Sequence, residues 1–254
     1  MIPIKKGGEI EGMRRSCRTV SAILERLAGM VEPGVTTGDL DAAAAKMIRE
    51  AGGKSPFYGY RGFPGHICVS VNDEVVHGIG GTRKLIYGDI IKLDVGILLD
   101  GWVGDTAVTV PVGAVTPEVE ALLARTEMAL SEGIRQAKAG GRLGDISAAI
   151  QKCVEDAGYS IVRDFVGHGV GRTLHEEPQI PNFGRPGSGP ALKAGMTLAI
   201  EPMVNMGGAQ IRILRDGWTV VTVDGKPSSH FEHTVLVTEG EPEILTCRNV
   251  TASR

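Results

Sequence analysis

The sequence is poor in the features that mark several protein classes. It has only four cysteines in 254 residues, at positions 17, 68, 153 and 247, and they form no CxxC pair. This spacing indicates neither a zinc knuckle nor a disulfide framework, and it fits a reducing compartment. No run approaches the roughly 18 apolar residues of a membrane span, and the N-terminus has no apolar signal segment. We therefore expect a cytoplasmic protein without a membrane partner.

An excess of positive charge is also lacking. The net charge is -3, with 42% hydrophobic and 22% charged residues, so the composition gives no reason to expect bound nucleic acid. Aromatic residues make up only 4%, whereas glycine is abundant at 36 residues, about twice the usual ~7%. The glycines cluster in segments 59–65, 78–81, 167–171 and 184–195. These clusters predict loops of defined shape.

Apolar residues recur at helical spacing in four segments, and glycine, proline or a capping residue marks their ends. We expect Thr37 or Asp39 to cap the second of these helices. The predicted helices cover residues 7–29, about 37–51, 116–139 and 143–157.

Two apolar, β-branched runs on either side of Asp100-Gly101 predict a β-hairpin over residues 90–110. Each run carries one acid, Asp94 or Asp105, at a position where an inward-facing side chain is normally apolar. A buried carboxylate is unfavourable unless a cation or hydrogen-bond donors compensate its charge. Two facing carboxylates also repel each other unless a metal lies between them. The hairpin therefore indicates a metal site.

The same anomaly occurs twice more, at Glu201 and at Glu232, which both lie in strand-like apolar runs. Three histidines, His77, His168 and His175, lie next to glycines or acids, although any one of them could be structural. Four acids with one histidine suggest an oxygen-rich dinuclear site with two bridging carboxylates. Such donors suit Mn(II), Fe(II), Co(II) or Zn(II).

An internal duplication relates the two halves of the chain. Shifting residues 34–52 by 106 positions onto 140–158 gives eight identities in 19 ungapped pairs. The duplication extends to the strands if 91–95 corresponds to 198–202, because Asp94 and Glu201 are then equivalent. Each half would supply one carboxylate to a crevice between them.

The chain resembles the type I methionine aminopeptidases, a group of pita-bread metalloproteases. The resemblance covers nearly all of residues 1–250. It rests on seven ordered motifs: GYRGFPGHICVSVNDEVVHGI at 59–79, KLDVG at 92–96, GWVGDTA at 101–107, GHGVGRTLHEEP at 167–178, IEPM at 200–203, DGWTVVT at 216–222 and FEHTVLVT at 231–238.

The resemblance implies an α+β pita-bread fold, in which two pseudo-twofold-related halves surround a central antiparallel β-sheet. We expect a single catalytic domain over residues 1–254, with halves of roughly 1–112 and 113–250. The implied activity is metal-dependent removal of the initiator methionine from nascent proteins, with a preference for a small second residue. A water or hydroxide that bridges two metals would attack the peptide carbonyl. The implied partner is the N-terminal methionine of nascent chains at the ribosome, and we expect a monomer.

Five metal ligands follow from the resemblance position by position. Asp94 and Asp105 would hold the second metal, and His168 and Glu201 the first. Asp105 and Glu232 would bridge both. The implied cofactors are two divalent ions per chain, Co, Mn, Fe(II) or Zn.

Catalytic and binding roles follow in the same way. Glu201 would shuttle a proton, His175 would stabilise the oxyanion, and His77 would contact the scissile amide or the residue after it. Asn72 and Ser228 match positions that help to hold a monovalent Na or K ion through nearby backbone carbonyls. The residues implied for substrate binding are Tyr60, Phe63, Cys68, His77, Leu174, His175 and Trp218.

Two positions depart from the family pattern. Leu174 stands where the family usually has Phe, beside the substrate pocket. His230 stands where the family usually has Gln, near the metals. We consider two interpretations of His230, a hydrogen-bond donor to a metal ligand and an exposed histidine at a strand edge.

Two other functions remain open from the sequence. A proline-specific pita-bread peptidase, of the Xaa-Pro aminopeptidase or prolidase type, would share the five ligands but usually carries a large N-terminal domain. Here only about 60 residues precede the glycine-rich segment at 59–65. A non-catalytic pita-bread protein that binds RNA or protein would be expected to lose ligands or gain basic tails. The short interval from His175 to Glu201 also lacks the helical insertion of type II enzymes.

Overall fold

A long hairpin lies at the centre of the computed structural model, which describes residues 1–247. Strand β3 (Ile90–Leu99) pairs with β4 (Trp102–Pro111) along the full length of both strands. The turn residues Asp100 and Gly101 both have positive φ, at 51° and 77°. Positive φ at both positions is typical of the two-residue turns that match the twist of a hairpin. The predicted hairpin is confirmed.

The four predicted helices are present, and their ends agree with the sequence prediction to within a few residues. One cap differs from the expectation. Thr36, and not Thr37 or Asp39, is the N-cap of the second helix, because its hydroxyl accepts the amide of Asp39 while the Asp39 carboxylate accepts the amide of Thr36. The helices are α1 (Gly8–Ala28), α2 (Thr37–Glu50), α3 (Pro117–Arg135) and α4 (Leu143–Glu155), with a 3-10 turn η1 (Tyr60–Gly62).

The helices α2 and α4 begin in the same way, as an internal duplication predicts. Asp145 accepts the amide of Arg142 at 2.7 Å, just as Asp39 accepts that of Thr36 at 2.9 Å. Each N-cap residue also forms an isolated β-bridge, Thr36 to Lys84 and Arg142 to residue 191. The two halves therefore repeat the same tertiary contact as well as one hydrogen bond of the cap.

The remaining strands form one large antiparallel sheet and two small ones. The large sheet has the order β1-β3-β4-β13-β8-β6-β7, and β14 pairs with β13. The small sheets have the orders β10-β11-β2 and β12-β9-β5. The strands not yet given are β1 (Cys68–Val71), β2 (Glu74–Val76), β5 (Ser160–Ile161), β6 (Gly167–Gly169), β7 (Glu176–Ile180), β8 (Thr197–Ile200), β9 (Met203–Asn205), β10 (Ile211–Ile213), β11 (Val220–Thr222), β12 (Ser228–His230), β13 (Glu232–Leu236) and β14 (Glu243–Ile244).

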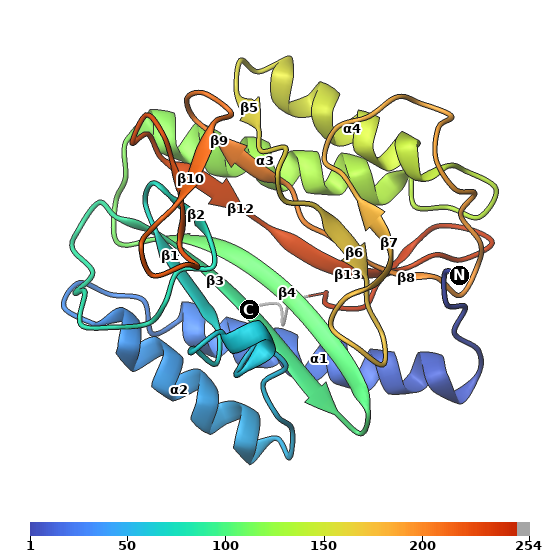
Figure 1. The fold of residues 1–254 in the computed structure, drawn as a ribbon, viewed down its shortest axis with the longest axis horizontal. Helices are drawn as coiled ribbons and strands as arrows, with labels where there is room; N and C mark the ends of the chain where they lie inside the picture. The colour runs from blue at the N-terminus through green and yellow to red at the C-terminus, as the bar shows by residue number, and fades with distance from the viewer. Residues whose placement is uncertain (248–254) are drawn as a thin grey trace, which may run out of the picture.

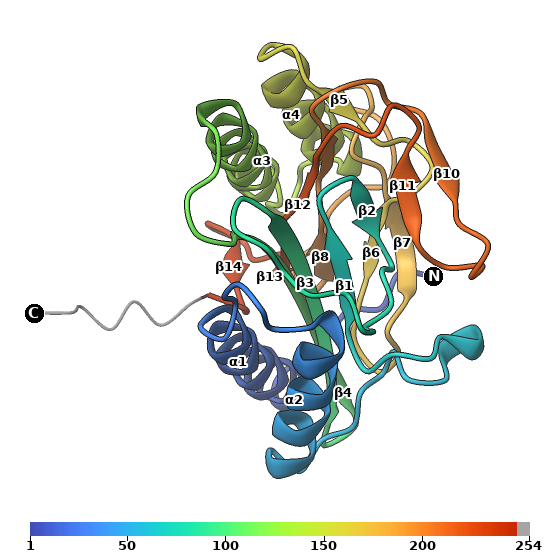
Figure 2. The same cartoon turned by 90° about the vertical axis from the view of Figure 1, so that its left-hand side faces the viewer.

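The helices lie in two pairs, with α1 and α2 along one end of the large sheet and α3 and α4 along the other (Figure 1). The view turned by 90° shows the strands β10 and β11 on the side of the sheet away from α1 and α3 (Figure 2). Helix α1 approaches the hairpin closely because Gly104 has no side chain. A Cβ there would lie 2.7 Å from the backbone of Ser16. The Ser16 hydroxyl then donates to carbonyls of both strands, at Ile97 and Trp102.

Buried side chains from both halves form one large apolar cluster under the helices, from Leu93 in β3 to Ile200 in β8. This burial is the main stabilising contribution to such a fold. Within residues 1–247 we find no helix of the length and hydropathy required to cross a bilayer. The division into halves near residue 112 stays a prediction.

Candidate active site

Five neighbouring strands of the large sheet each deliver one of the expected metal ligands. In the order β3, β4, β13, β8 and β6, the residues are Asp94, Asp105, Glu232, Glu201 (which directly follows β8) and His168. All five line one cavity of about 630 Å³. The sheet thus brings together residues that are up to 138 positions apart in the sequence.

The register of the hairpin places the two aspartates diagonally and not directly opposite each other. Asp94 pairs with Ala107, and Asp105 pairs with Gly96. Ala107 also pairs with Glu232 on the other side. Residues two apart on a strand share a face, so three carboxylates surround one small methyl group. Asp94 and Asp105 are therefore near each other, as expected, but they are diagonal neighbours across the hairpin.

The ligand atoms lie close enough to share cations. One carboxylate oxygen each of Asp105 and Glu232 and one ring nitrogen of His168 lie within 4.8 Å of one another. His168 Nε2 is 3.5 Å from Glu201 Oε1 and 3.8 Å from Asp105 Oδ2. Asp94 lies outside the 4.8 Å group but lines the same cavity. The arrangement is that of one tight cluster with a further carboxylate beside it.

Buried oxygens in this cluster have no protein partner. Asp94 Oδ1, Asp105 Oδ1 and Glu232 Oε1 are inaccessible and accept no hydrogen bond from residues 1–247. Burial raises the pKa of Asp94 to about 7 and that of Glu201 to about 8. Burial and repulsion between neighbouring carboxylates raise the pKa of Asp105 and Glu232 well above the usual range. Bound cations would remove both penalties, so the residues present fit a divalent metal centre.

The ring of His168 is oriented for coordination. Its Nδ1 lies 2.9 Å from the carbonyl oxygen of Gly169, which places the proton on Nδ1 as the donor. The lone pair is then on Nε2, which faces Asp105 and Glu201. Burial lowers the pKa of His168 to about 3, so the imidazole is neutral as a metal ligand requires.

An apolar wall forms the other side of the cavity. Phe63, Cys68 and Leu174 are buried there in one cluster, and the Trp218 ring meets Phe63 edge-on with centroids 5.1 Å apart. Aromatic edges and sulfur are suitable partners for a thioether. The residues expected for substrate binding that line the cavity are Tyr60, Phe63, Cys68, His77, Leu174, His175 and Trp218.

The two histidines expected to act on substrate lie at different positions around the cavity. His77 has a left-handed backbone, with φ 59°, and its ring packs edge-on against Phe165. Burial lowers its pKa to about 4. His175 is partly exposed, its ring meets the His168 ring edge-on with centroids 4.3 Å apart, and it shares a hydrogen bond with Tyr60. Both can donate to a bound peptide in the neutral form.

His230 is not the exposed strand-edge residue that one interpretation allowed. It is almost completely buried, and its Nε2 is 3.5 Å from Glu201 Oε2. Neither ring nitrogen forms a hydrogen bond with the described residues. The exposed interpretation is wrong because β12 is covered by β9 on one side and by the hairpin residue Thr109 on the other.

Asn72 and Ser228 do not line the cavity. Instead, their backbone carbonyls accept hydrogen bonds from the ammonium of Lys92, which is 1% exposed. The sequence interpretation missed Lys92, although it breaks the apolar pattern of β3 in the same way as Asp94 two residues later. It also missed Phe57, Phe165 and Met203 in the cavity wall; an isolated apolar residue gives no signal in a sequence.

Known proteins are similar to this chain in sequence. The model of metallopeptidase family M24 matches residues 11–239. The chain is 51% identical over 246 residues to methionine aminopeptidase 1 of Bacillus subtilis. This match covers 97% of this chain and 99% of that protein. It is 42% identical to methionine aminopeptidase 1 of Mycobacterium tuberculosis, over 97% of this chain and 95% of that protein.

Solved structures agree with these matches. The crystal structure of the methionine aminopeptidase of Thermotoga maritima superposes with a TM-score of 0.95 at 46% identity, over 97% of this chain and 99% of that chain. The prolidase of Pyrococcus furiosus superposes with a TM-score of 0.79 at 21% identity, over 96% of this chain but 65% of that chain. The prolidase shares the fold, and about a third of its own chain lies outside the superposed part.

Proposed function

The chain belongs to metallopeptidase family M24, and we propose that it works as a type I methionine aminopeptidase that removes the initiator methionine from nascent proteins with a small second residue. The convergence of four acids and His168 beside an apolar wall carries this proposal. The relatives that match it over nearly their whole length are named methionine aminopeptidases. We place the reaction in the cytoplasm, on chains at the ribosome, and treat the protein as a monomer.

The metal centre takes two divalent ions in this proposal. His168 and Glu201 would hold the first ion and Asp94 the second, while Asp105 and Glu232 would contribute to both. The 4.8 Å grouping of Asp105, His168 and Glu232 supports a cation held jointly by these three residues, because their atoms already surround one point. When bound, such ions lower the pKa of a water molecule and polarise the scissile carbonyl.

The protein's own groups then handle orientation and protons. Glu201, which lines the cavity beside His168, is the group that takes a proton from water and returns it to the leaving amine. His175 donates to the developing oxyanion, and His77 contacts the scissile amide or the residue after it. The wall of Phe63, Cys68 and Trp218 binds the methionine thioether.

The experiment compares two peptides on the purified protein after reconstitution with Mn(II), Fe(II) or Co(II). We expect release of methionine from Met-Ala-Ser and no cleavage of Ala-Pro-Ala. Cleavage of Ala-Pro-Ala in place of Met-Ala-Ser would indicate the proline-specific alternative, and metal binding without any cleavage would indicate a binding protein. Acetylated Met-Ala-Ser is the control, because an aminopeptidase requires the free amino group.

A further inference from the structure

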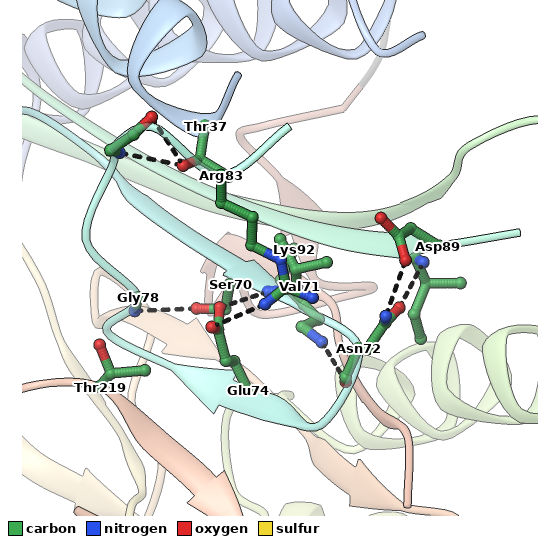
Figure 3. Close-up of polar contacts among 12 residues, drawn as sticks. Thr37, Ser70, Val71, Asn72, Glu74, Gly78, Arg83, Asp89, Lys92 and Thr219 are labelled. Atoms are coloured by element: carbon green, nitrogen blue, oxygen red, sulfur yellow. Dashed lines mark hydrogen bonds and ion pairs between the residues drawn. The ribbon is translucent and has the colours of Figure 1, made fainter. Parts of the chain in front are cut away.

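A buried lysine lies beneath the active site, on the strand that carries Asp94. Lys92 is among the largest completely buried side chains of the described residues. Its Nζ donates to the carbonyl oxygen of Asn72 at 2.7 Å and to that of Ser228 at 3.0 Å (Figure 3 labels Lys92 and Asn72). Burial of an ammonium is unfavourable unless polar groups satisfy it, and backbone carbonyls do so here.

The same two carbonyls belong to the positions expected to hold a Na or K ion. Asn72 O also accepts the amide of Ser228 at 3.1 Å, so both of its lone pairs are engaged. The ammonium thus takes the coordination that an alkali ion would need, and a second cation beside it would be repelled. The residues present do not fit a separate monovalent ion at Asn72 and Ser228.

The conformation of Asn72 keeps its carbonyl oxygen directed at the Lys92 ammonium. Its backbone has φ 55°, in the left-handed region that Asn tolerates better than most residues. The side chain donates to Asp89 Oδ1 at 2.8 Å and accepts the amide of Ile90 at 2.9 Å (Figure 3). The loop after β1 is therefore shaped around the ammonium.

We propose that the ammonium of Lys92 replaces the monovalent cation of this site, so that the protein carries a covalently attached cation and needs neither Na nor K. An alkali ion and an ammonium group make the same kind of contact with carbonyl dipoles. The attached cation is present at an effective concentration that no salt can match. Its position no longer depends on the composition of the medium.

The lysine also binds the strand that precedes an expected metal ligand. Lys92 pairs with Thr109 across the hairpin. Thr109 Oγ1 donates to the carbonyl of His230 at 2.7 Å and accepts its amide at 2.9 Å. The cross-strand pair therefore holds both ends of β12, Ser228 through the ammonium and His230 through the hydroxyl. Strand β12 ends two residues before Glu232, so the carbonyl that Lys92 binds lies on the segment that leads to this acid.

Carboxylates near the ammonium favour a cation here. Those of Glu74, Asp73 and Asp89 lie close enough to attract it, whereas the guanidinium of Arg83 opposes it. Glu74 in turn accepts the amide of Val71 at 2.6 Å. The measurements below are made at pH 6.5.

The test compares the thermal stability of the full-length protein in KCl, NaCl and tetramethylammonium chloride at equal ionic strength. We expect the wild-type Tm to be the same in all three salts. Lys92→Ala leaves carbonyls without a partner and opens space beside them, so its Tm should fall by roughly 5–15 °C. Part of this loss should be restored by KCl or NaCl, and not by the bulky tetramethylammonium ion.

Lys92→Met is the matched control, because it fills the space without a charge. It should be destabilised in all salts without any rescue. A crystal of Lys92→Ala soaked in Tl(I) should show an anomalous peak between the Asn72 and Ser228 carbonyls, and the wild-type crystal should show none.

A wild-type Tm that rises in KCl over tetramethylammonium chloride, or a Tl(I) peak at this position in the wild type, would overturn the proposal. So would a folded Lys92→Ala protein that shows no response to alkali ions. If Lys92→Ala does not fold, the wild-type measurements alone decide. The readouts need no substrate, so their outcome is independent of the reaction proposed above.

Discussion

Tyr60 and His175 are joined by a hydrogen bond of 2.8 Å between Tyr60 Oη and His175 Nδ1. When the phenol donates to the neutral imidazole, the imidazole proton is on Nε2. Burial and the nearby charge of Arg61 lower the pKa of His175, which keeps the ring neutral. The pair thus presents an N–H at the cavity, as an oxyanion donor requires.

Replacement of His175 by Ala should leave the metals bound and reduce kcat. We expect a loss of roughly 10²–10³, the usual effect of removing one oxyanion donor. Steady-state kinetics on Met-Ala-Ser and metal analysis by mass spectrometry measure the two quantities. His66→Ala is the control, since His66 stacks on Tyr58 outside the cavity wall. Loss of metal from His175→Ala would show that His175 is a ligand.

Replacement of Tyr60 by Phe should reduce kcat less, by about 3–10-fold, because one hydrogen bond that selects the tautomer is lost. The effect should depend on His175. In a double-mutant cycle, Tyr60→Phe should cost nothing further once His175 is Ala. Additive losses in the double variant would contradict the positioning role of Tyr60.

Replacement of Asp105 by Asn should abolish activity and lower the metal stoichiometry. The amide removes one negative charge from between two cations. In the metal-free protein the same change removes a buried carboxylate whose pKa is raised, so the variant should be more stable than the wild type at pH 8. Asp100→Asn is the matched control on the same hairpin, because Asp100 is exposed at the turn and pairs with Arg15. Full activity with two bound metals would exclude a bridging Asp105.

The metal-free protein should lose stability as the pH rises from 6.5 to 8.5. The folded-state pKa values of Asp94 and Glu201, about 7 and 8, exceed unfolded values near 4. The folded state therefore binds more protons than the unfolded chain, and stability falls with increasing pH. Asp105 and Glu232 act in the same direction. Lys92, with a pKa lowered to about 7, has the opposite effect on stability above that pH. It is one group, whereas four carboxylates act in the first direction.

Buried histidines such as His168 and His77, whose pKa values are lowered to about 3 and 4, affect stability only below their unfolded value near 6.5. The window above pH 6.5 therefore excludes these histidines and leaves the carboxylates, with Lys92 as the opposing group. Calorimetry in EDTA measures the trend, and saturation with Mn(II) should remove it. A metal-free Tm that increases across this window would be the contrary result.

Replacement of Leu174 by Phe should lower KM for Met-Ala-Ser by at most about tenfold, with little change in kcat. Leu174 is buried in the wall with Phe63 and Cys68. A ring would add a contact with the thioether worth about 0.3–1.5 kcal/mol. Such uniform binding changes KM alone. A large fall in kcat at constant KM would place Leu174 in the catalytic machinery.

Several features of this protein are determined by short stretches of its sequence. The Asp100-Gly101 turn, the four helices and the shared caps of α2 and α4 depend on residues within a few positions of one another. Asp94 and Asp105 could be identified as unusual because an acid in an apolar strand is unfavourable wherever that strand packs. Glu201 and Glu232 showed the same anomaly, and the family motifs then indicated His168 and the expected role of each ligand.

Only the tertiary structure decided how His230 is buried, which proton His168 carries, and what fills the site at Asn72 and Ser228. Lys92 and the Ser228 carbonyl that it binds are 136 positions apart, and Thr109 and the His230 carbonyl 121. No pattern along one strand reveals what another strand places against it. Burial and hydrogen bonding of a side chain depend on all segments that surround it, and these segments come together only when the chain folds.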